Sequence, residues 1–200
     1  MNAKLSHQSS EHATPPEIIE PMREVLGGID LDPCTTQLIN TEIVKAERFY
    51  TLTDNGFRQE FRGTTWLNPP GGYCDAYGIP CPRDLLGRQV RTPGAVSSPR
   101  AWFERLVKHH QAGLVPAFGY EAFSIEQLAT LQKIQEPYRK ITDFAFCVLR
   151  ERVRHLRLNH DGELVRGNAP THASAIVYAG PNLRKFKRLF SKLGATGVLR

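Results

Sequence analysis

The chain has 200 residues, 40% of them hydrophobic, which is enough for one sizeable core and predicts a single domain over residues 13–200. Its 26 Lys and Arg residues against 20 Asp and Glu give a net charge of +6, which favours a polyanionic partner. No apolar run reaches the ~18 residues of a membrane-spanning helix and the N-terminus has no signal-peptide core, so we expect a soluble, intracellular protein.

The first predicted elements are a tail and a helix. Residues 1–12 are polar and show no periodicity, which predicts a mobile tail. Thr14, Pro15 and Glu17 have the pattern of a capping box with Thr14 as the N-cap, and apolar residues at helical spacing continue to Gly27-Gly28. Because a helix N-terminus presents free N–H groups, we expect it to bind an anion such as a ligand carboxylate.

Two predicted strands end in polar residues. Residues 28–34 read as a short buried strand that ends at Asp32-Pro33, and residues 62–67 lead directly into Asn68. Carboxylates at the C-terminal ends of central strands lie where open α/β sheets bind their ligands. For Asp32 taken alone, a solvent-facing turn residue is an equally good interpretation.

The most informative motif is Asn68-Pro69-Pro70-Gly71-Gly72. Proline fixes φ at about −65° and has no N–H, so the two prolines hold a rigid turn and favour an extended Asn68. The Asn68 side-chain oxygen and the Pro69 carbonyl oxygen are then two neighbouring hydrogen-bond acceptors. Such a pair suits an exocyclic amino group, whereas an ordinary proline-rich turn is the competing interpretation.

Residues 71–99 are rich in glycine, proline and arginine. A structureless segment of this length in a compact domain is usually functional or disordered, so we expect either a lid that contacts substrate or a disordered insertion. Its two cysteines, Cys74 and Cys81, lack the usual zinc spacing, which predicts reduced thiols and no metal. A zinc ion held by both cysteines and a histidine is the lesser alternative.

The rest of the chain alternates between helices and strands and includes one hairpin. The predicted elements are a helix over 97–113, a strand over 114–118, a helix over 124–134, a strand over 144–149, a hairpin over 153–165, a strand over 173–178 and a final basic helix over 183–193 capped by Gly194. This order indicates an α/β fold with a mixed sheet flanked by helices. Arginines gather at 150–157, either as phosphate contacts or as a solvated face.

Taken together, these segments resemble the phage-type DNA N6-adenine methyltransferase family, a group of compact S-adenosylmethionine-dependent amino-methyltransferases. The segments that carry the resemblance are 14–17, 28–33, 50–56 and 66–71, followed by 102–106, 148–154 and 173–178. The resemblance covers residues 13–195 except 73–96. It implies a Rossmann-like class I methyltransferase fold, a phage or mobile-element origin and a location in the bacterial cytoplasm.

The resemblance also implies a catalytic motif and a DNA surface. Asn68, Pro69 and Pro70 would act on N6 of an adenine flipped out of DNA. The residues that would contact the DNA are Tyr73, Arg150, Arg152 and Arg154.

For the cofactor, the resemblance implies two groups of contacts with S-adenosylmethionine. Thr14 and Pro15 would meet its methionine end, and Asp54 its adenosine. The strand end on which it would rest consists of Asp30, Asp32 and Pro33.

The chain departs from the family pattern at two places. Residues 34–37 lack the glycines that follow the Asp-Pro strand end, and Gly71 stands where the family has an aromatic residue. Stacking of such a ring on a base is worth ~1–3 kcal/mol, so Tyr73 or Tyr77 would have to replace it. The alternatives are therefore a catalytically impaired protein that binds DNA or a partner, and an amino-methyltransferase that acts on RNA or on a protein glutamine.

Overall fold

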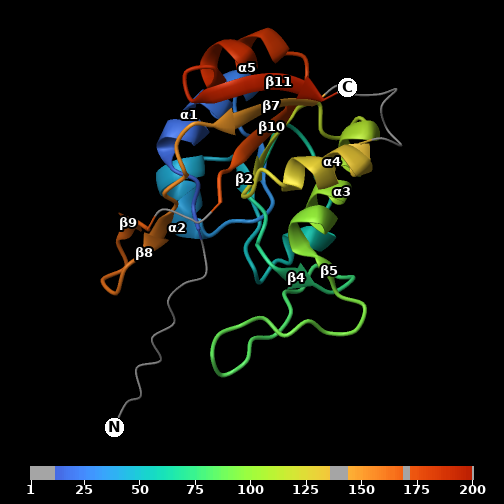
Figure 1. Ribbon diagram of the computed structural model, residues 1–200, viewed down its shortest axis with the longest axis vertical. Coiled ribbons are helices and arrows are strands. Elements are labelled where there is room, and N and C mark those ends of the chain that lie inside the picture. Colours follow the sequence, from blue (N-terminus) through green and yellow to red (C-terminus); the bar gives the residue numbers. More distant parts are fainter. Residues whose placement is uncertain (1–11, 136–143, 169–171, 200) are drawn as a thin grey trace.

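The computed structural model describes residues 12–135, 144–168 and 172–199 (Figure 1). Its main feature is a seven-stranded sheet in the order β11-β7-β10-β6-β3-β1-β2, with helices on both faces. The predicted α/β fold with a mixed sheet is therefore confirmed. The tail predicted over residues 1–12 lies outside the described residues, apart from His12.

Four neighbouring strands of this sheet are parallel: β2 (Arg48–Phe49), β1 (Leu31–Asp32), β3 (Thr65–Leu67) and β6 (Phe118–Ala122). From β1 the chain passes through α2 (Gln37–Ile39) and the π-helix η1 (Asn40–Val44) to β2 on one side. It then returns through the short helix η2 (Gly56–Arg58) to β3 on the other side. This reversal creates a topological switch point between the carboxyl ends of β1 and β3.

The other half of the sheet is antiparallel. β10 (Ala175–Ala179) runs antiparallel to both β6 and β7 (Phe144–Leu149), so β7 ends at the same edge as β6. β11 (Gly194–Leu199) pairs with β7 over its whole length, and the prediction that Gly194 caps the last helix is wrong. The strand predicted over 114–118 lies later in the chain: β6 spans Phe118–Ala122, and its first residue pairs with Thr65 of β3.

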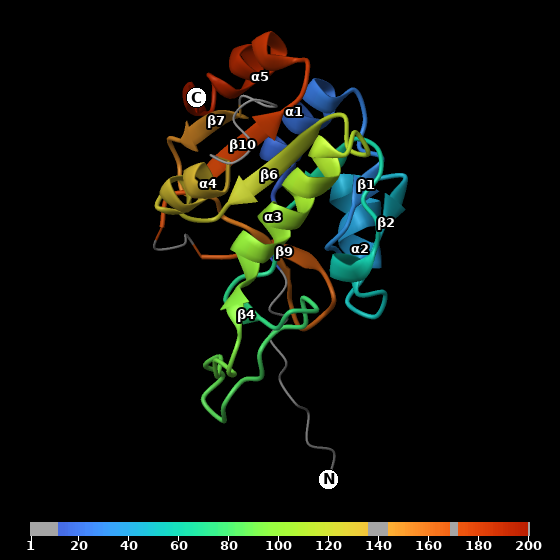
Figure 2. The same ribbon diagram turned by 90° about the vertical axis from the view of Figure 1, so that its right-hand side faces the viewer.

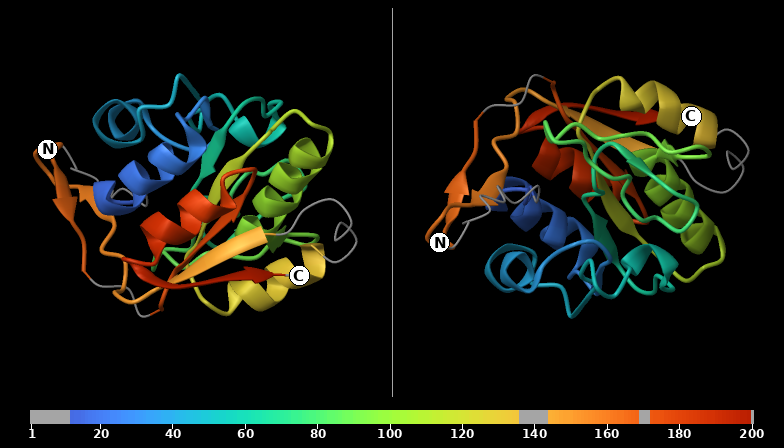
Figure 3. Two further views of the ribbon diagram at one scale, coloured as in Figure 1. Left: turned by 90° about the horizontal axis from the view of Figure 1, so that it is seen from above. Right: turned by 90° about the horizontal axis from the view of Figure 1, so that it is seen from below.

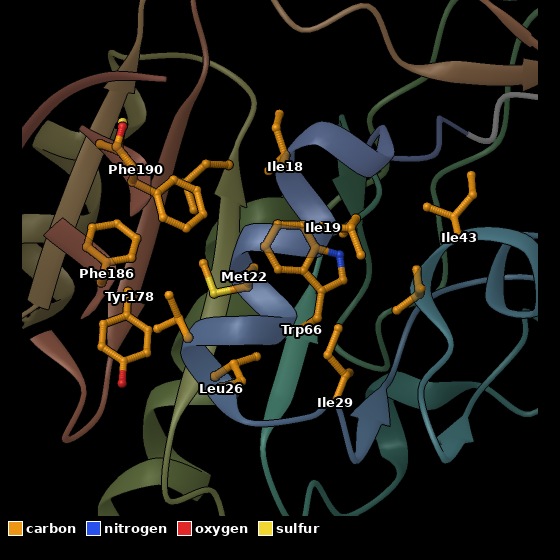
Figure 4. Packing of buried hydrophobic residues seen from close by; sticks show 14 of the residues in the cluster. Ile18, Ile19, Met22, Leu26, Ile29, Ile43, Trp66, Tyr178, Phe186 and Phe190 are labelled. Atoms are coloured by element: carbon orange, nitrogen blue, oxygen red, sulfur yellow. The ribbon is translucent and has the colours of Figure 1, made fainter. Parts of the chain in front are cut away.

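The helices cover the two faces of the sheet separately. α1 (Pro16–Leu26) and α5 (Leu183–Phe190) pack on one face, and α3 (Ser98–Gln111) and α4 (Gln127–Gln135) pack on the other. Figure 4 shows Met22 of α1 and Trp66 of β3 in the first of these layers. Gly119 lies under Met22, and a Cβ atom at residue 119 would be 2.6 Å from the Met22 Sδ atom. Helix α1 therefore rests directly on β6.

The predicted capping box at the start of α1 is wrong. Pro15, and not Thr14, is the N-cap, and no side chain caps the helix. Pro15 and Pro16 have no N–H groups, so the start of this helix has fewer unpaired donors than usual. Thr14 instead donates its hydroxyl to Glu121 Oε2 (2.5 Å), and Glu17 pairs with Arg166 Nη1 (2.6 Å).

Residues 72–97 form a projecting segment that we call the arm (Figure 2). At its base, β4 (Tyr73–Cys74) pairs with β5 (Val96–Ser97). The Gln89 side chain accepts from the Tyr73 N–H (2.7 Å) and donates to the Tyr73 carbonyl oxygen (2.7 Å). Between β4 and β5 the arm is a long loop of turns and isolated bridges, as predicted, and hydrogen bonds of its own side chains hold it.

A second projection is the hairpin of β8 (Leu156–Leu158) and β9 (Leu164–Arg166), which confirms the predicted hairpin. The hairpin and the arm both lie in the lower half of Figure 2, and the view from below shows the hairpin at one side of the molecule (Figure 3, right). Within the described part of the chain, no helix is both long enough and apolar enough to cross a membrane.

Candidate functional site

The carboxyl ends of β1 and β3 carry Asp32 and Asn68. Leu31 pairs with Thr65, so β1 and β3 are direct neighbours, and Asn68 follows the last residue of β3. Both polar residues therefore flank the topological switch point, where open α/β sheets bind their ligands. The structure brings these two predicted residues to neighbouring strand ends.

The side-chain amide of Asn68 donates a hydrogen bond through Nδ2, and its Oδ1 atom accepts none from the described residues. Its Nδ2 atom donates to the His12 carbonyl oxygen (2.8 Å). Among the described residues, no donor reaches Asn68 Oδ1 or the Pro69 carbonyl oxygen. We call these two oxygens the Asn68–Pro69 acceptor pair. Because the amide nitrogen is held by His12, the side-chain oxygen has a defined orientation.

The segment that holds Asn68 is itself fixed to the hairpin. The backbone N–H of Ala13 donates to the Leu156 carbonyl oxygen (2.9 Å), and the Leu156 N–H donates back to Ala13 (2.9 Å). This two-bond bridge places the His12 carbonyl at the carboxyl end of β3. The hairpin is thus connected to Asn68 through only two residues.

A buried carboxylate, Glu121, lies on the strand next to Asn68. Leu67 pairs with Tyr120, so residue 121 lies beside residue 68, and Glu121 has 0% exposure. Its Oε2 atom accepts from the Thr14 hydroxyl, and its Oε1 atom is bonded to His155 Nε2 (2.8 Å). We call Thr14, Glu121 and His155 the Glu121 cluster. Sequence reasoning missed Glu121 and His155, although an acid inside an apolar run (residues 117–123) was a usable signal.

The contact with Glu121 favours protonation of His155. Burial alone would lower the pKa of His155, but its hydrogen bond to Glu121 and the charge of that carboxylate outweigh burial and raise the pKa. His12, whose ring lies 5.9 Å from the ring of His155, has its pKa lowered by burial and by that neighbouring charge. The contact between Glu121 and His155 is therefore an ion pair whenever His155 is protonated, and that charge disfavours a second proton on His12.

Asp32 is a second buried acid at this edge, with 3% exposure. Burial raises the pKa of Asp32 to about 7, and the hydrogen bond from the Cys34 N–H to Asp32 Oδ1 (3.0 Å) opposes this only in part. Carboxyl groups whose pKa is raised by burial are frequent at functional sites.

We expect Asp32→Asn to stabilise the protein in alkaline buffer. Because the pKa of Asp32 rises from 3.8 to about 7 on folding, the folded state binds more protons between these values and stability falls as pH rises through this window. Asparagine does not ionise, so the variant should gain up to about 4 kcal/mol of unfolding free energy at about pH 8 and nothing at about pH 3. Urea denaturation across this range measures the gain, and parallel stability profiles for both proteins would contradict it.

The other predicted cofactor residues lie at opposite edges of the sheet: Asp30 at the amino ends of the parallel strands, and Pro33 and Asp54 beyond their carboxyl ends. The Asp30 carboxylate accepts from the Thr64 N–H (2.7 Å) before the start of β3, so it is not brought together with Asn68. Asp54 is exposed on the turn after β2 and accepts from Thr51. Pro33 is buried at the end of β1, and its carbonyl oxygen lies 2.0 Å from where a Cβ on Gly56 would be. These contacts join the loops that follow β1 and β2.

The predicted substrate residues lie around the same edge. Tyr73 is 37% exposed at the base of the arm, with the Arg91 guanidinium 4.8 Å from its ring centroid. The segment after the carboxyl end of β7 exposes three arginines on either side of a buried Val153: Arg150, Arg152 and Arg154. A basic surface therefore begins at the edge that carries Asn68.

The cysteines of the arm give no sign of a metal centre. Cys74 and Cys81 are buried, and none of the four cysteines forms a disulfide. No group of three metal-ligating side chains exists in the part of the chain that the structure describes. In comparisons with known proteins, no protein-family model and no curated protein matches this chain.

Proposed function

We propose that this protein transfers a methyl group from S-adenosylmethionine to N6 of adenine in DNA, and that its sheet is a compact class I methyltransferase fold. One observation carries the proposal. The Asn68–Pro69 acceptor pair lies at the carboxyl end of β3, next to the buried Asp32 at the end of β1. These two features flank the switch point of the sheet, the position at which Rossmann-like folds bind nucleotides.

The chemistry of this edge fits the cofactor. Acidic side chains at strand ends accept hydrogen bonds from ribose hydroxyls in Rossmann-like folds. Asp32 is the last residue of β1, and Asp54 lies on the turn after β2. Thr14 and Pro15 lie at the start of α1, on the same side of the sheet as Glu121, and would face the methionine end. When bound, S-adenosylmethionine supplies a methyl group on a positively charged sulfur.

The chain itself contributes position and orientation. An exocyclic amino group has two N–H donors, and the Asn68–Pro69 acceptor pair offers one oxygen to each. Holding both donors fixes the direction of the nitrogen lone pair, and such positioning contributes several kcal/mol without any protein nucleophile. The hydrogen bond from Asn68 Nδ2 to His12 keeps the amide from turning its nitrogen towards the base.

The surroundings support DNA as the source of the amine. The N6 atom is inaccessible inside a duplex, so the adenine must be flipped out of the stack. Exposed arginines after β7 and a net charge of +6 suit the phosphates. Tyr73, two residues beyond Gly71, supplies the exposed ring that would stack on the flipped base.

The decisive experiment is transfer of a labelled methyl group to duplex DNA, to RNA and to protein in parallel. We expect label in DNA, recovered as N6-methyladenine after digestion. Label in RNA or in protein glutamine would instead identify another amine for the same acceptor pair. Heat of DNA binding without cofactor binding and without transfer would identify a binding protein and overturn the proposal.

The arginine surface makes a separate prediction about salt. We expect the triple variant Arg150→Ala, Arg152→Ala, Arg154→Ala to bind DNA more weakly and less salt-dependently. Each lost phosphate contact lowers the slope of log K against log salt concentration by about 0.9. Fluorescence anisotropy with duplex DNA at several salt concentrations measures the slope. An unchanged slope would place the DNA on another surface.

A further inference from the structure

The tip of the arm exposes two leucines. Of the ten large apolar side chains that are exposed among the described residues, seven lie on the arm, so its apolar surface is concentrated rather than scattered. Leu85 and Leu86 are the most prominent of these seven, with 105% and 76% exposure. Turns usually carry glycine, asparagine or serine, so two leucines at this place require an explanation.

Hydrogen bonds hold these leucines on a rigid turn. The Gly87 N–H donates to the Asp84 carbonyl oxygen (2.9 Å), which makes Leu85 and Leu86 the two central residues of the turn. Asp84 Oδ1 also accepts from the N–H groups of Leu86 (2.9 Å) and Arg88 (2.9 Å). The two apolar side chains are therefore presented to solvent by a braced turn and not by a loose loop.

The charge around the tip is basic, and the arm that carries the tip begins beside the site. Arg83 and Arg88 flank the turn, and Arg91 follows it. The arm begins two residues after Pro70, at the carboxyl edge of the sheet. It projects beyond this edge in the lower half of Figure 2, where the hairpin also lies.

We propose that Leu85 and Leu86 form a wedge that enters the base stack of duplex DNA beside the flipped adenine. Apolar side chains flanked by arginines are the composition of proteins that separate base steps, since arginine binds the backbone while the apolar group replaces a stacked neighbour. Flipping a base leaves a gap whose closure would return it to the duplex, and a rigid apolar tip fills that gap. The inference rests on the proposed function, because it assigns duplex DNA as the substrate.

The first test measures unstacking directly and needs no methyl transfer. Duplexes that carry 2-aminopurine in place of adenine, in a pool of sequence contexts, become fluorescent when that base leaves the stack. The wild-type protein should raise the fluorescence, and the double variant Leu85→Ser, Leu86→Ser should raise it about tenfold less. Leu52→Ser is the matched control, since Leu52 lies outside the arm and is 77% exposed.

The second test compares methyl transfer to single-stranded and duplex DNA. Single-stranded DNA has no stack to open, so the double variant should lose activity about tenfold on duplex DNA only. Equal losses on both substrates, or none, would overturn the wedge. So would a wild-type protein that leaves 2-aminopurine dark.

Two further outcomes separate the possible failures. The first is a dimer for wild type and a monomer for the double variant in gel filtration, with equal fluorescence responses. In that case the tip is a self-association surface, and the wedge is overturned. If no nucleic acid is methylated, the proposed function fails, and the fluorescence test still decides the wedge. Both leucines are exposed, so thermal unfolding of the double variant should match wild type.

Discussion

Replacing Asn68 with alanine is expected to reduce methyl transfer by about a hundredfold or more while cofactor binding is retained. The variant loses Oδ1, one half of the Asn68–Pro69 acceptor pair, and with it the orientation of the amino group. The loss should therefore appear in kcat. Calorimetry with S-adenosylmethionine checks that the cofactor still binds. We expect binding to be retained because the predicted cofactor contacts, Asp32 and Asp54 among them, are unchanged in this variant.

Asn68→Asp is the matched variant for this experiment. Aspartate keeps an acceptor oxygen, but it has no N–H group to donate to the His12 carbonyl oxygen. If acceptance by Oδ1 is the essential function, aspartate should restore much of the activity that alanine loses. Transfer by Asn68→Ala within twofold of wild type would remove Asn68 from the chemistry.

The second large effect is expected for Glu121. Glu121→Ala should lower the free energy of unfolding by about 3–5 kcal/mol below neutral pH, because it leaves a protonated and largely enclosed His155 without its partner. Thr14 would lose its acceptor at the same time. Chemical denaturation at a pH below neutral measures this loss. Glu24→Ala is a control, since Glu24 pairs with Lys185 and Arg188 at an exposed surface, where an ion pair is worth at most about 1 kcal/mol.

The pH dependence distinguishes the ion pair from simple packing. The pKa of His155 is raised above its ordinary value of 6.5 in the folded state, so the pair stabilises fully below that value and loses its effect as pH rises through the raised pKa. Glu121→Gln keeps the volume and one acceptor but not the charge. Its deficit relative to wild type should be large at about pH 5 and small at about pH 9. A deficit independent of pH would show that charge does not matter.

The placement of Asp32 and Asn68 at strand ends was predictable because its signals are local. The two prolines after Asn68 constrain neighbouring residues only, and the alternation of elements predicted that this motif would follow a strand. Asp32 and Asn68 accordingly lie where their strands end. The hairpin at β8–β9 was predictable for the same reason, since its turn residues are contiguous.

The parts that were missed depend on contacts between distant residues. The capping pattern at Thr14 was read locally, but its hydroxyl bonds to a residue 107 positions away. Strand β11 has glycines and no clear alternation, and its conformation comes from pairing with β7. The order of the arm depends on Gln89, which reaches back across 16 residues to Tyr73. No short-range pattern reports such contacts.

Gly119 has no side chain, and this allows Met22 to pack against the backbone of β6. Met22 rests on that glycine, so residue 119 sets the spacing between helix α1 and the sheet, and α1 begins two residues after Thr14. A methyl group at residue 119 would clash with the Met22 side chain and force this buried side chain to move. In a random-mutagenesis screen, an inactive variant at residue 119 would therefore indicate disturbed packing between α1 and β6 and not the loss of a reactive group.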